Sequence, residues 1–246
     1  MVSRKTLSNY CDQYLDVASF EDYCPNGLQV QGKSEIKTIV SGVSANQALI
    51  DCAIDQKADA IFVHHGFFWK NEKPNITGIK KNRIQALLAN NINLFAYHLP
   101  LDAHPQIGNN VELAKRLDIQ NIRQIDHTLL WQGETHSSLK DFIQKVEKTT
   151  SRKPLVIGEA SAEFKTIAWC TGAAQNYIDI AIDAEVDAYL TGEVSEATPA
   201  IAKENNLVFI SAGHHATERY GVEALAKHLS DKFGLKHQFI DIDNQV

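Results

Sequence analysis

The sequence has few cysteines, and they follow no pattern that would bind a metal or form a redox pair. The four residues are widely separated, and no C-x-x-C pair occurs among Cys11, Cys24, Cys52 and Cys170. This spacing excludes a zinc ribbon and a thioredoxin-like motif. A chain of 246 residues buries roughly 70 to 75 % of its unfolded surface. We therefore expect it to fold without disulfides or a structural metal.

Concentrated positive charge and long apolar runs are also missing. The net charge is −6 and no cluster of Lys and Arg occurs, which argues against duplex binding, because that requires a basic face. No apolar run approaches the ~20 residues of a membrane-spanning helix. The N-terminal segment has the pattern of an amphipathic helix and lacks the apolar core of a signal peptide. These features predict a soluble cytoplasmic protein.

Two common catalytic signatures, the G-x-x-x-x-G-K-[ST] phosphate loop and the G-x-S-x-G nucleophile elbow, do not occur. The sequence does contain I-F-V-H-H-G at 61–66. A short β-branched and aromatic run ending in glycine is typical of a buried strand. His64 and His65 are then expected where the strand meets a loop, the place where α/β sheets bind ligands. Two adjacent imidazoles on an extended backbone diverge, so they suit two metals better than one.

Strand and helix patterns alternate along the chain and predict an α/β fold with mostly parallel sheets flanked by helices. Segment 39–66 resembles segment 168–193, and 90–102 resembles 205–218. The repeat predicts two similar α/β halves, intimately joined around one metal site. We expect the halves at 1–118 and 167–246, and between them an inserted module at 119–166. This module is either a lid or an oligomerisation element.

Other candidate ligands also follow predicted strands. Asp102 lies in a predicted ordered loop after the strand at 93–97, and His214 and Glu218 are one helical turn apart, a spacing that lets both reach one ion or a close pair. Three imidazoles and two carboxylates fit a dinuclear site for Zn, Fe, Ni or Mn. The predicted assignment gives one of His64 and His65 to each metal, makes Asp102 and His214 further ligands and makes Glu218 the bridge. Taken singly, each residue also fits an ordinary strand, loop or helix cap.

Three further polar residues are candidates for contact with substrate or with the ligands. His98, at a strand end, is either a proton-transfer residue or a packed histidine. Thr191 and Glu193 occupy the repeat positions of Val63 and His65 and are expected to face the site. His215 is left outside the predicted ligand set. Five other histidines are predicted on the solvated surface, and they are His104, His127, His136, His228 and His237.

Together these motifs carry a family resemblance. They are P-N-G-L-Q-V-x-G at 25–32, H-H-G at 64–66, H-L-P-L-D at 98–102, T-G-E at 191–193 and G-H-x-A-T-E at 213–218. The chain resembles, over essentially its whole length, the bacterial short form of the GTP cyclohydrolase 1 type 2 homologue family, also called the NIF-three-like family. The resemblance implies a duplicated α/β fold and a toroidal homohexamer with metal sites facing its cavity. It also implies two divalent ions per chain, with the ligands His64, His65, Asp102, His214 and Glu218.

Two functional hypotheses follow. The first is a metal-dependent hydrolase, similar to a GTP cyclohydrolase, acting on a nucleotide or related phosphate-bearing small molecule, including the removal of damaged nucleotides. Two ions favour this chemistry because they lower the pKa of a water and polarise a substrate oxygen. The alternative is a non-catalytic protein that binds or delivers metal, or a hexameric interaction scaffold. A hydrolase requires polar groups such as His98 and Glu193 beside an open coordination position.

Overall fold

The computed structural model describes residues 1–125, 128–159 and 164–246. The chain divides into two units, each built around its own sheet. Unit 1 comprises Met1–Gly108 and Gly221–Asp243, and unit 2 comprises Asn109–Tyr220 and Asn244–Val246. None of the helices formed by the described residues combines the length and the hydropathy that crossing a bilayer requires.

Unit 1 contains a five-stranded sheet in the order β13-β4-β5-β6-β2. The first four strands are parallel, and β2 pairs with β6 in the antiparallel direction. The strands are β2 (Gly27–Val30), β4 (Thr38–Ser44), β5 (Ala60–His65), β6 (Asn93–Ala96) and β13 (Lys236–Phe239), with a separate two-stranded pair β1 (Val2–Ser3) and β3 (Glu35–Ile36). The helices are α1 (Arg4–Tyr14), the short η1 (Val17–Ser19), α2 (Gln47–Asp55), α3 (Gly78–Ala89), α4 (Leu99–Ala103) and most of α10 (Arg219–Phe233).

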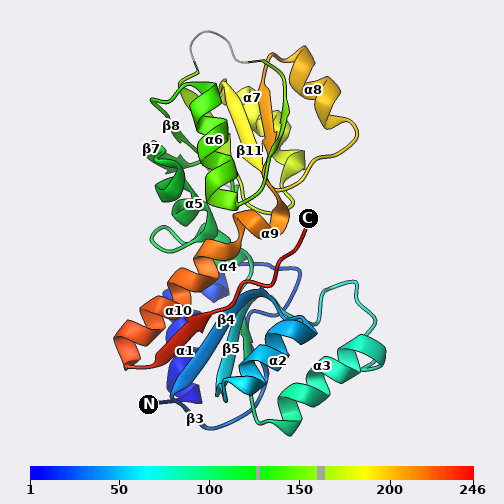
Figure 1. Cartoon of the computed structure of the whole chain (residues 1–246), viewed down its shortest axis with the longest axis vertical. Helices are drawn as coiled ribbons and strands as arrows, with labels where there is room; N and C mark the ends of the chain where they lie inside the picture. Colours follow the sequence, from blue (N-terminus) through cyan, green and yellow to red (C-terminus); the bar gives the residue numbers. More distant parts are fainter. Residues whose placement is uncertain (126–127, 160–163) are drawn as a thin grey trace. The chain divides into compact units, whose positions relative to one another are not determined.

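Helices cover both faces of the unit 1 sheet (Figure 1). Helices α1 and α10 pack on the face that carries Phe62 and Phe95. Helices α2 and α3 pack on the opposite face, which carries Ile61 and Val63. Because strand side chains alternate between faces and both faces are covered, β5 is a continuous apolar run. The only polar residues in this strand are the two histidines at its carboxyl end.

Unit 2 has the same three layers around a six-stranded sheet in the order β7-β8-β10-β11-β12-β9. Its parallel centre is β10-β11-β12, and β8 and β9 flank this centre in the antiparallel direction. Helices α5 and α6 pack on one face, and α7 and α8 on the other (Figure 1). The strands are β7 (Gln120–Gln124), β8 (Trp131–Glu134), β9 (Leu155–Ile157), β10 (Thr166–Trp169), β11 (Ala188–Thr191) and β12 (Val208–Ser211). The helices are α5 (Asn109–Leu117), α6 (Leu139–Thr150), η2 (Gln175–Tyr177), α7 (Ile178–Asp183), α8 (Thr198–Glu204) and α9 (His214–Thr217).

One pair of aspartates shows the internal duplication in atomic detail. Asp59 precedes β5, and its Oδ2 accepts the backbone N–H of Thr38 at 3.0 Å. Asp187 precedes β11, and its Oδ2 accepts the backbone N–H of Thr166 at 2.8 Å. Each aspartate also donates its own backbone N–H to the carbonyl of the same threonine. Both units therefore begin their two central parallel strands with the same carboxylate clasp.

The units do not follow the predicted boundaries at residues 118 and 167. Helix α5 belongs to unit 2, while most of α10 belongs to unit 1. These two helices carry the matching sequence patterns that follow the two repeats, so each repeat contributes its last helix to the other unit. The physical reason is burial: Leu113 and Leu117 of α5 lie in a unit 2 core, and Leu225 and Leu229 of α10 lie in a unit 1 core.

The predicted inserted module is an integral part of unit 2. Its strands β7, β8 and β9 extend the sheet on both sides, and Phe142 and Val146 of α6 are buried in the core. Its role as a lid or in oligomerisation stays a prediction.

Two local predictions were wrong. The expected loop after β6 contains the short helix α4, which begins with Leu99 and Pro100, a residue type that suits the first helical turn. His104 was expected on the surface but is only 8 % exposed. Its Nε2 donates to the Tyr14 carbonyl at 3.1 Å, and its Nδ1 accepts the backbone N–H of Gln106 at 3.2 Å. His127 lies outside the described residues.

Candidate functional site

Three histidines of unit 1 lie together. His64 and His65 are the last residues of β5, and His98 immediately precedes α4. The ring centroids are 4.7 Å apart for His64 and His65, 5.0 Å for His64 and His98, and 5.7 Å for His65 and His98. All three offer ligand atoms within 4.8 Å of one another. Unit 1 therefore presents three imidazoles that could bind a metal, although the sequence had linked only the first two as ligands.

Each of these imidazoles is held through Nδ1, which leaves Nε2 as the nitrogen suited to a ligand. The partners are the Tyr97 carbonyl for His64 at 2.9 Å, the Ser44 hydroxyl for His65 at 3.2 Å and the Asp22 carboxylate for His98 at 2.7 Å. Such a bond at the second nitrogen fixes the ring orientation and tautomer of a metal-binding histidine. The cluster is therefore pre-oriented for a cation.

Asp102 adds a carboxylate to the unit 1 cluster. It lies within α4 and is 5 % exposed. Its Oδ2 is 3.5 Å from Nε2 of His64. Its backbone N–H donates to the His98 carbonyl at 3.2 Å, so the helical turn that replaced the expected loop connects these two residues. Nitrogen and carboxylate donors together suit Zn, Fe, Ni or Mn.

Unit 2 supplies one histidine between two carboxylates. Nδ1 of His214 is 2.6 Å from Oε1 of Glu193, and Nε2 is 3.1 Å from Oε2 of Glu218. Helix α9 ends at Thr217, so the helix breaks just before Glu218. The predicted pair at positions i and i+4 nevertheless meets. Glu193 therefore contacts this histidine from the side opposite Glu218.

The electrostatics of this group favour a positive charge. Burial acts to lower the pKa of His214, but its hydrogen bonds and charge interactions with Glu218 and Glu193 outweigh burial and raise the pKa to about 9. A divalent cation at Nε2 would take the place of the proton there, because imidazole binds metals in its neutral form. The residues of unit 2 therefore fit a metal ion by their donor chemistry.

Two glycines make room for these side chains. Gly172 has a φ of +70°, and a Cβ added there would collide with Oε1 of Glu218. Any Cβ at Gly192 would lie 2.6 Å from the Cα of His214. Thr191 holds the Gly172 turn, because its Oγ1 donates to the Gly172 carbonyl at 3.1 Å. Thr191 thus supports the site through the backbone, whereas Glu193 touches a predicted ligand directly.

Sequence reasoning missed Asp22, Ser44 and Gly172. Asp22 lies in an irregular segment with no periodicity, so its only signal was the P-N-G turn that begins at Pro25. Gly172 lies three residues after the end of β10, and nothing in the sequence pattern indicated its close approach to Glu218. His215, kept outside the ligand set, is buried and donates its backbone N–H to the Val246 carbonyl at 3.0 Å.

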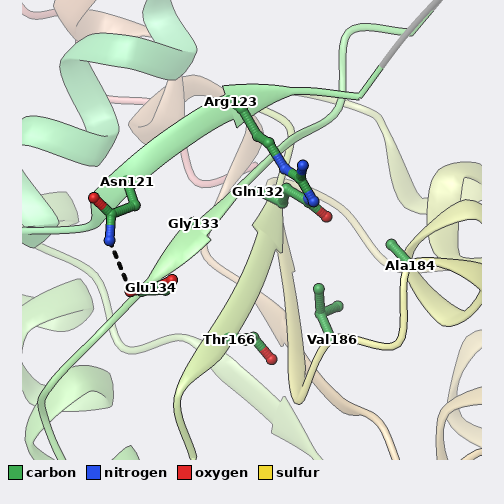
Figure 2. A pocket seen from close by; sticks show the side chains of 8 residues that line it. All are labelled: Asn121, Arg123, Gln132, Gly133, Glu134, Thr166, Ala184 and Val186. Atoms are coloured by element: carbon green, nitrogen blue, oxygen red, sulfur yellow. Dashed lines mark hydrogen bonds between the residues drawn. The ribbon is translucent and has the colours of Figure 1, made fainter.

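A separate cavity of about 380 Å³ lies in unit 2 over β7, β8 and β10 (Figure 2). Its polar rim includes Arg123, Gln132 and the pair Asn121 and Glu134, joined by a 2.8 Å hydrogen bond. Among the described residues that line it, none is a predicted site residue. This cavity therefore adds nothing to the metal-binding groups.

Comparison with known proteins finds relatives that match nearly the whole chain. The model of the Duf34/NIF3 (NGG1p interacting factor 3) family matches residues 2–245. A "GTP cyclohydrolase 1 type 2 homolog" of Haemophilus influenzae is 51 % identical over 245 residues, covering 97 % of each chain. One with the same name from Pseudomonas aeruginosa is 50 % identical over 251 residues, covering 99 % of this chain and 98 % of that protein. The solved structure of protein ybgI, of unknown function, matches with a TM-score of 0.96 and 45 % identity over 100 % of both chains. The chain therefore belongs to the Duf34/NIF3 family.

Proposed function

We propose that this protein is a metal-dependent hydrolase that acts on a nucleotide or related phosphate-bearing small molecule. The observation that carries the proposal is the cluster of three imidazoles in unit 1, each anchored at Nδ1. The name of the relatives, "GTP cyclohydrolase 1 type 2 homolog", supports the substrate class. A guanine nucleotide is accordingly the first substrate to test.

The residues proposed to hold two divalent ions per chain are His64, His65 and Asp102 from unit 1, and His214 and Glu218 from unit 2. When bound, Zn, Mn, Fe or Ni ions supply Lewis acidity and lower the pKa of a water. That both sets act on the same two ions is a prediction from the sequence. Metal content tests it, because a bridging Glu218 predicts that Glu218→Ala lowers the occupancy of both metal positions.

Two side chains of unit 1, His98 and Trp69, are proposed to accept a proton and to limit the entry of water. His98 keeps Nε2 available beside His64 and His65 because its Nδ1 is bonded to Asp22. Trp69 packs edge-on against His98, with ring centroids 5.1 Å apart at 86°. Nε2 of His98 is thus the proposed proton acceptor, and Trp69 is a wall that limits the approach of bulk water.

The test is a screen of nucleotides and phosphoesters, including GTP, with each metal added separately to the purified protein. Activity should require Mn, Zn, Fe or Ni, disappear with chelator and fall in Asp102→Ala. His136→Ala is the matched control, since His136 is an exposed histidine outside the site. Turnover that survives in Asp102→Ala, or that falls equally in His136→Ala, would contradict the assignment.

A second candidate function is metal binding or delivery without turnover, including service as an interaction scaffold. It is favoured by the two carboxylates that flank His214, because this arrangement attracts a cation whether or not a substrate is turned over. Two bound ions combined with no activity towards any substrate would select this function. For either function we propose a toroidal homohexamer, which predicts six times the chain mass in light scattering.

A further inference from the structure

We propose that Asp22 is the positioning residue for His98: it keeps the imidazole proton on Nδ1 and directs Nε2 towards His64 and His65. The use of Nε2 in catalysis rests on the proposed function. The orientation and the tautomer rest on geometry within unit 1 alone.

The carboxylate of Asp22 is saturated with donors. Oδ1 accepts the backbone N–H of Tyr23 at 2.6 Å and Nδ1–H of His98 at 2.7 Å. Oδ2 accepts Nδ2–H of Asn26 at 2.8 Å and the backbone N–H of Leu99 at 2.9 Å. An ionised carboxylate only accepts hydrogen bonds, so the nitrogen of His98 that faces it carries a proton.

Asp22 is held in its ionised form. Its side chain is 3 % exposed, and burial acts to raise its pKa. The hydrogen bond and charge of His98, with the bonds from Asn26 and Leu99, outweigh burial and lower the pKa to about 2. A buried carboxylate with four donors is more than a surface ion pair, and it fixes the geometry of its partners.

The ring of His98 is clamped on its other sides as well. Its backbone N–H donates to Oδ1 of Asn26 at 2.7 Å, so Asn26 ties the backbone of His98 to the carboxylate of Asp22. The ring packs against His64 at a centroid distance of 5.0 Å and against Trp69 at 5.1 Å. These contacts restrict rotation of the ring, which leaves Nε2 as an acceptor on the side of the histidine cluster.

A structural role for Asp22, limited to holding the turn at residues 22–26, would also make its substitution destabilising. The tautomer of His98 separates the two roles. In Asp22→Asn, an amide oxygen towards Asn26 and Leu99 places the NH2 group towards Tyr23 and His98, and of these donors only His98 can become an acceptor. The opposite orientation turns the NH2 group towards two fixed donors, so the first orientation is favoured. Nδ1 of His98 must then accept, and the proton moves to Nε2. Asp22→Glu retains a carboxylate and should retain the original tautomer.

The experiment is ¹⁵N nuclear magnetic resonance of metal-free protein labelled in histidine, at a pH where His98 is neutral, with its signal assigned by loss in His98→Gln. We expect Nδ1–H in the wild type and in Asp22→Glu, and mainly Nε2–H in Asp22→Asn. Nε2–H in the wild type overturns the proposal by itself, even where Asp22→Asn fails to fold. An unchanged tautomer in folded Asp22→Asn overturns it as well.

Asp59→Asn is the matched control, because Asp59 is a carboxylate of the same unit that accepts backbone N–H groups and contacts Lys33 in place of a histidine. It should lower the melting temperature and leave the tautomer of His98 unchanged. If the protein hydrolyses a substrate, Asp22→Asn should lower kcat about 10- to 100-fold at unchanged metal content. A tautomer change in a protein with no activity on any substrate would refute the hydrolase proposal and support the role of Asp22.

Discussion

Units 1 and 2 share an architecture but differ at the carboxyl ends of their central strands. β5 ends in two histidines, whereas β11 is followed by Gly192 and Glu193. At matching repeat positions, His65 is a candidate ligand, while Glu193 holds the candidate ligand His214. The carboxylate clasp before each strand is the same in both units. The duplicated chain thus kept the interactions that build the sheet and changed the residues that carry chemistry.

The largest expected effects come from two single substitutions, each of which removes one carboxylate from the predicted metal ligands. Asp102→Ala and Glu218→Ala should each lower turnover by on the order of a thousandfold, because a lost metal contact removes several kcal/mol of transition-state stabilisation. The two variants should differ in metal content. We expect Asp102→Ala to lose at most one ion per chain and Glu218→Ala to lose more, measured by elemental analysis. Equal losses would contradict the bridging role of Glu218.

The next largest effects are expected from replacing His98 in unit 1 and Glu193 in unit 2, which contact predicted ligands. His98→Gln should lower kcat ~10²-fold or more without changing metal content, because it removes a proton acceptor. Glu193→Gln should weaken metal binding about 10- to 100-fold, because Glu193 orients His214. Metal titrations and steady-state kinetics of both variants separate these roles. Metal loss in His98→Gln would instead make His98 a ligand.

Sequence patterns predicted these features to different degrees, for physical reasons. The α/β class followed from apolar periodicity, because buried strands and amphipathic helices impose it locally. The duplication followed from the similarity of segments 39–66 and 168–193. The exchange of α5 and α10 between units was not predictable, since periodicity indicates that a helix has an apolar face but not which core that face contacts. The candidate site residues were identified because histidines and carboxylates, which commonly bind metals, follow the ends of predicted strands. Asp22 escaped because its partner His98 is 76 positions away and nothing local marks the pair.

A smaller effect on stability concerns the paired clasps. Burial acts to raise the pKa of Asp59 and of Asp187, but the hydrogen bonds that each carboxylate accepts outweigh burial and lower its pKa. The donors are Lys33, Lys37 and Thr38 for Asp59, and Thr166 and Lys165 for Asp187. Asp59→Asn and Asp187→Asn should each cost about 1 to 3 kcal/mol of unfolding free energy. Hydrogen exchange should place each loss in the unit that carries the substitution. An equal loss of protection in both units would show that the clasps do not act locally.

The same clasps predict the sign of an acid effect. A carboxyl whose pKa is lower in the folded state stabilises the fold above the unfolded pKa of about 3.9 and loses that contribution as the pH falls further. Wild-type protein should therefore lose stability below about pH 4, and each Asp→Asn variant should lose less over that range. Denaturant unfolding at several pH values measures this difference. If both variants lose unfolding free energy with falling pH as steeply as the wild type, the clasps are not the source of the acid effect.

The smallest expected effect is that of metal removal on the fold. Each unit buries an apolar core on both faces of its sheet. Domains with such cores are stabilised by about 5 to 15 kcal/mol without a metal. Chelator treatment and His64→Ala should therefore leave the helical circular dichroism spectrum unchanged, and His136→Ala provides the matched histidine control. Loss of helix in His64→Ala but not in His136→Ala would show that the unit 1 histidines stabilise the fold. It would contradict the view that the clasps build the sheets while the residues at the strand ends serve only the chemistry.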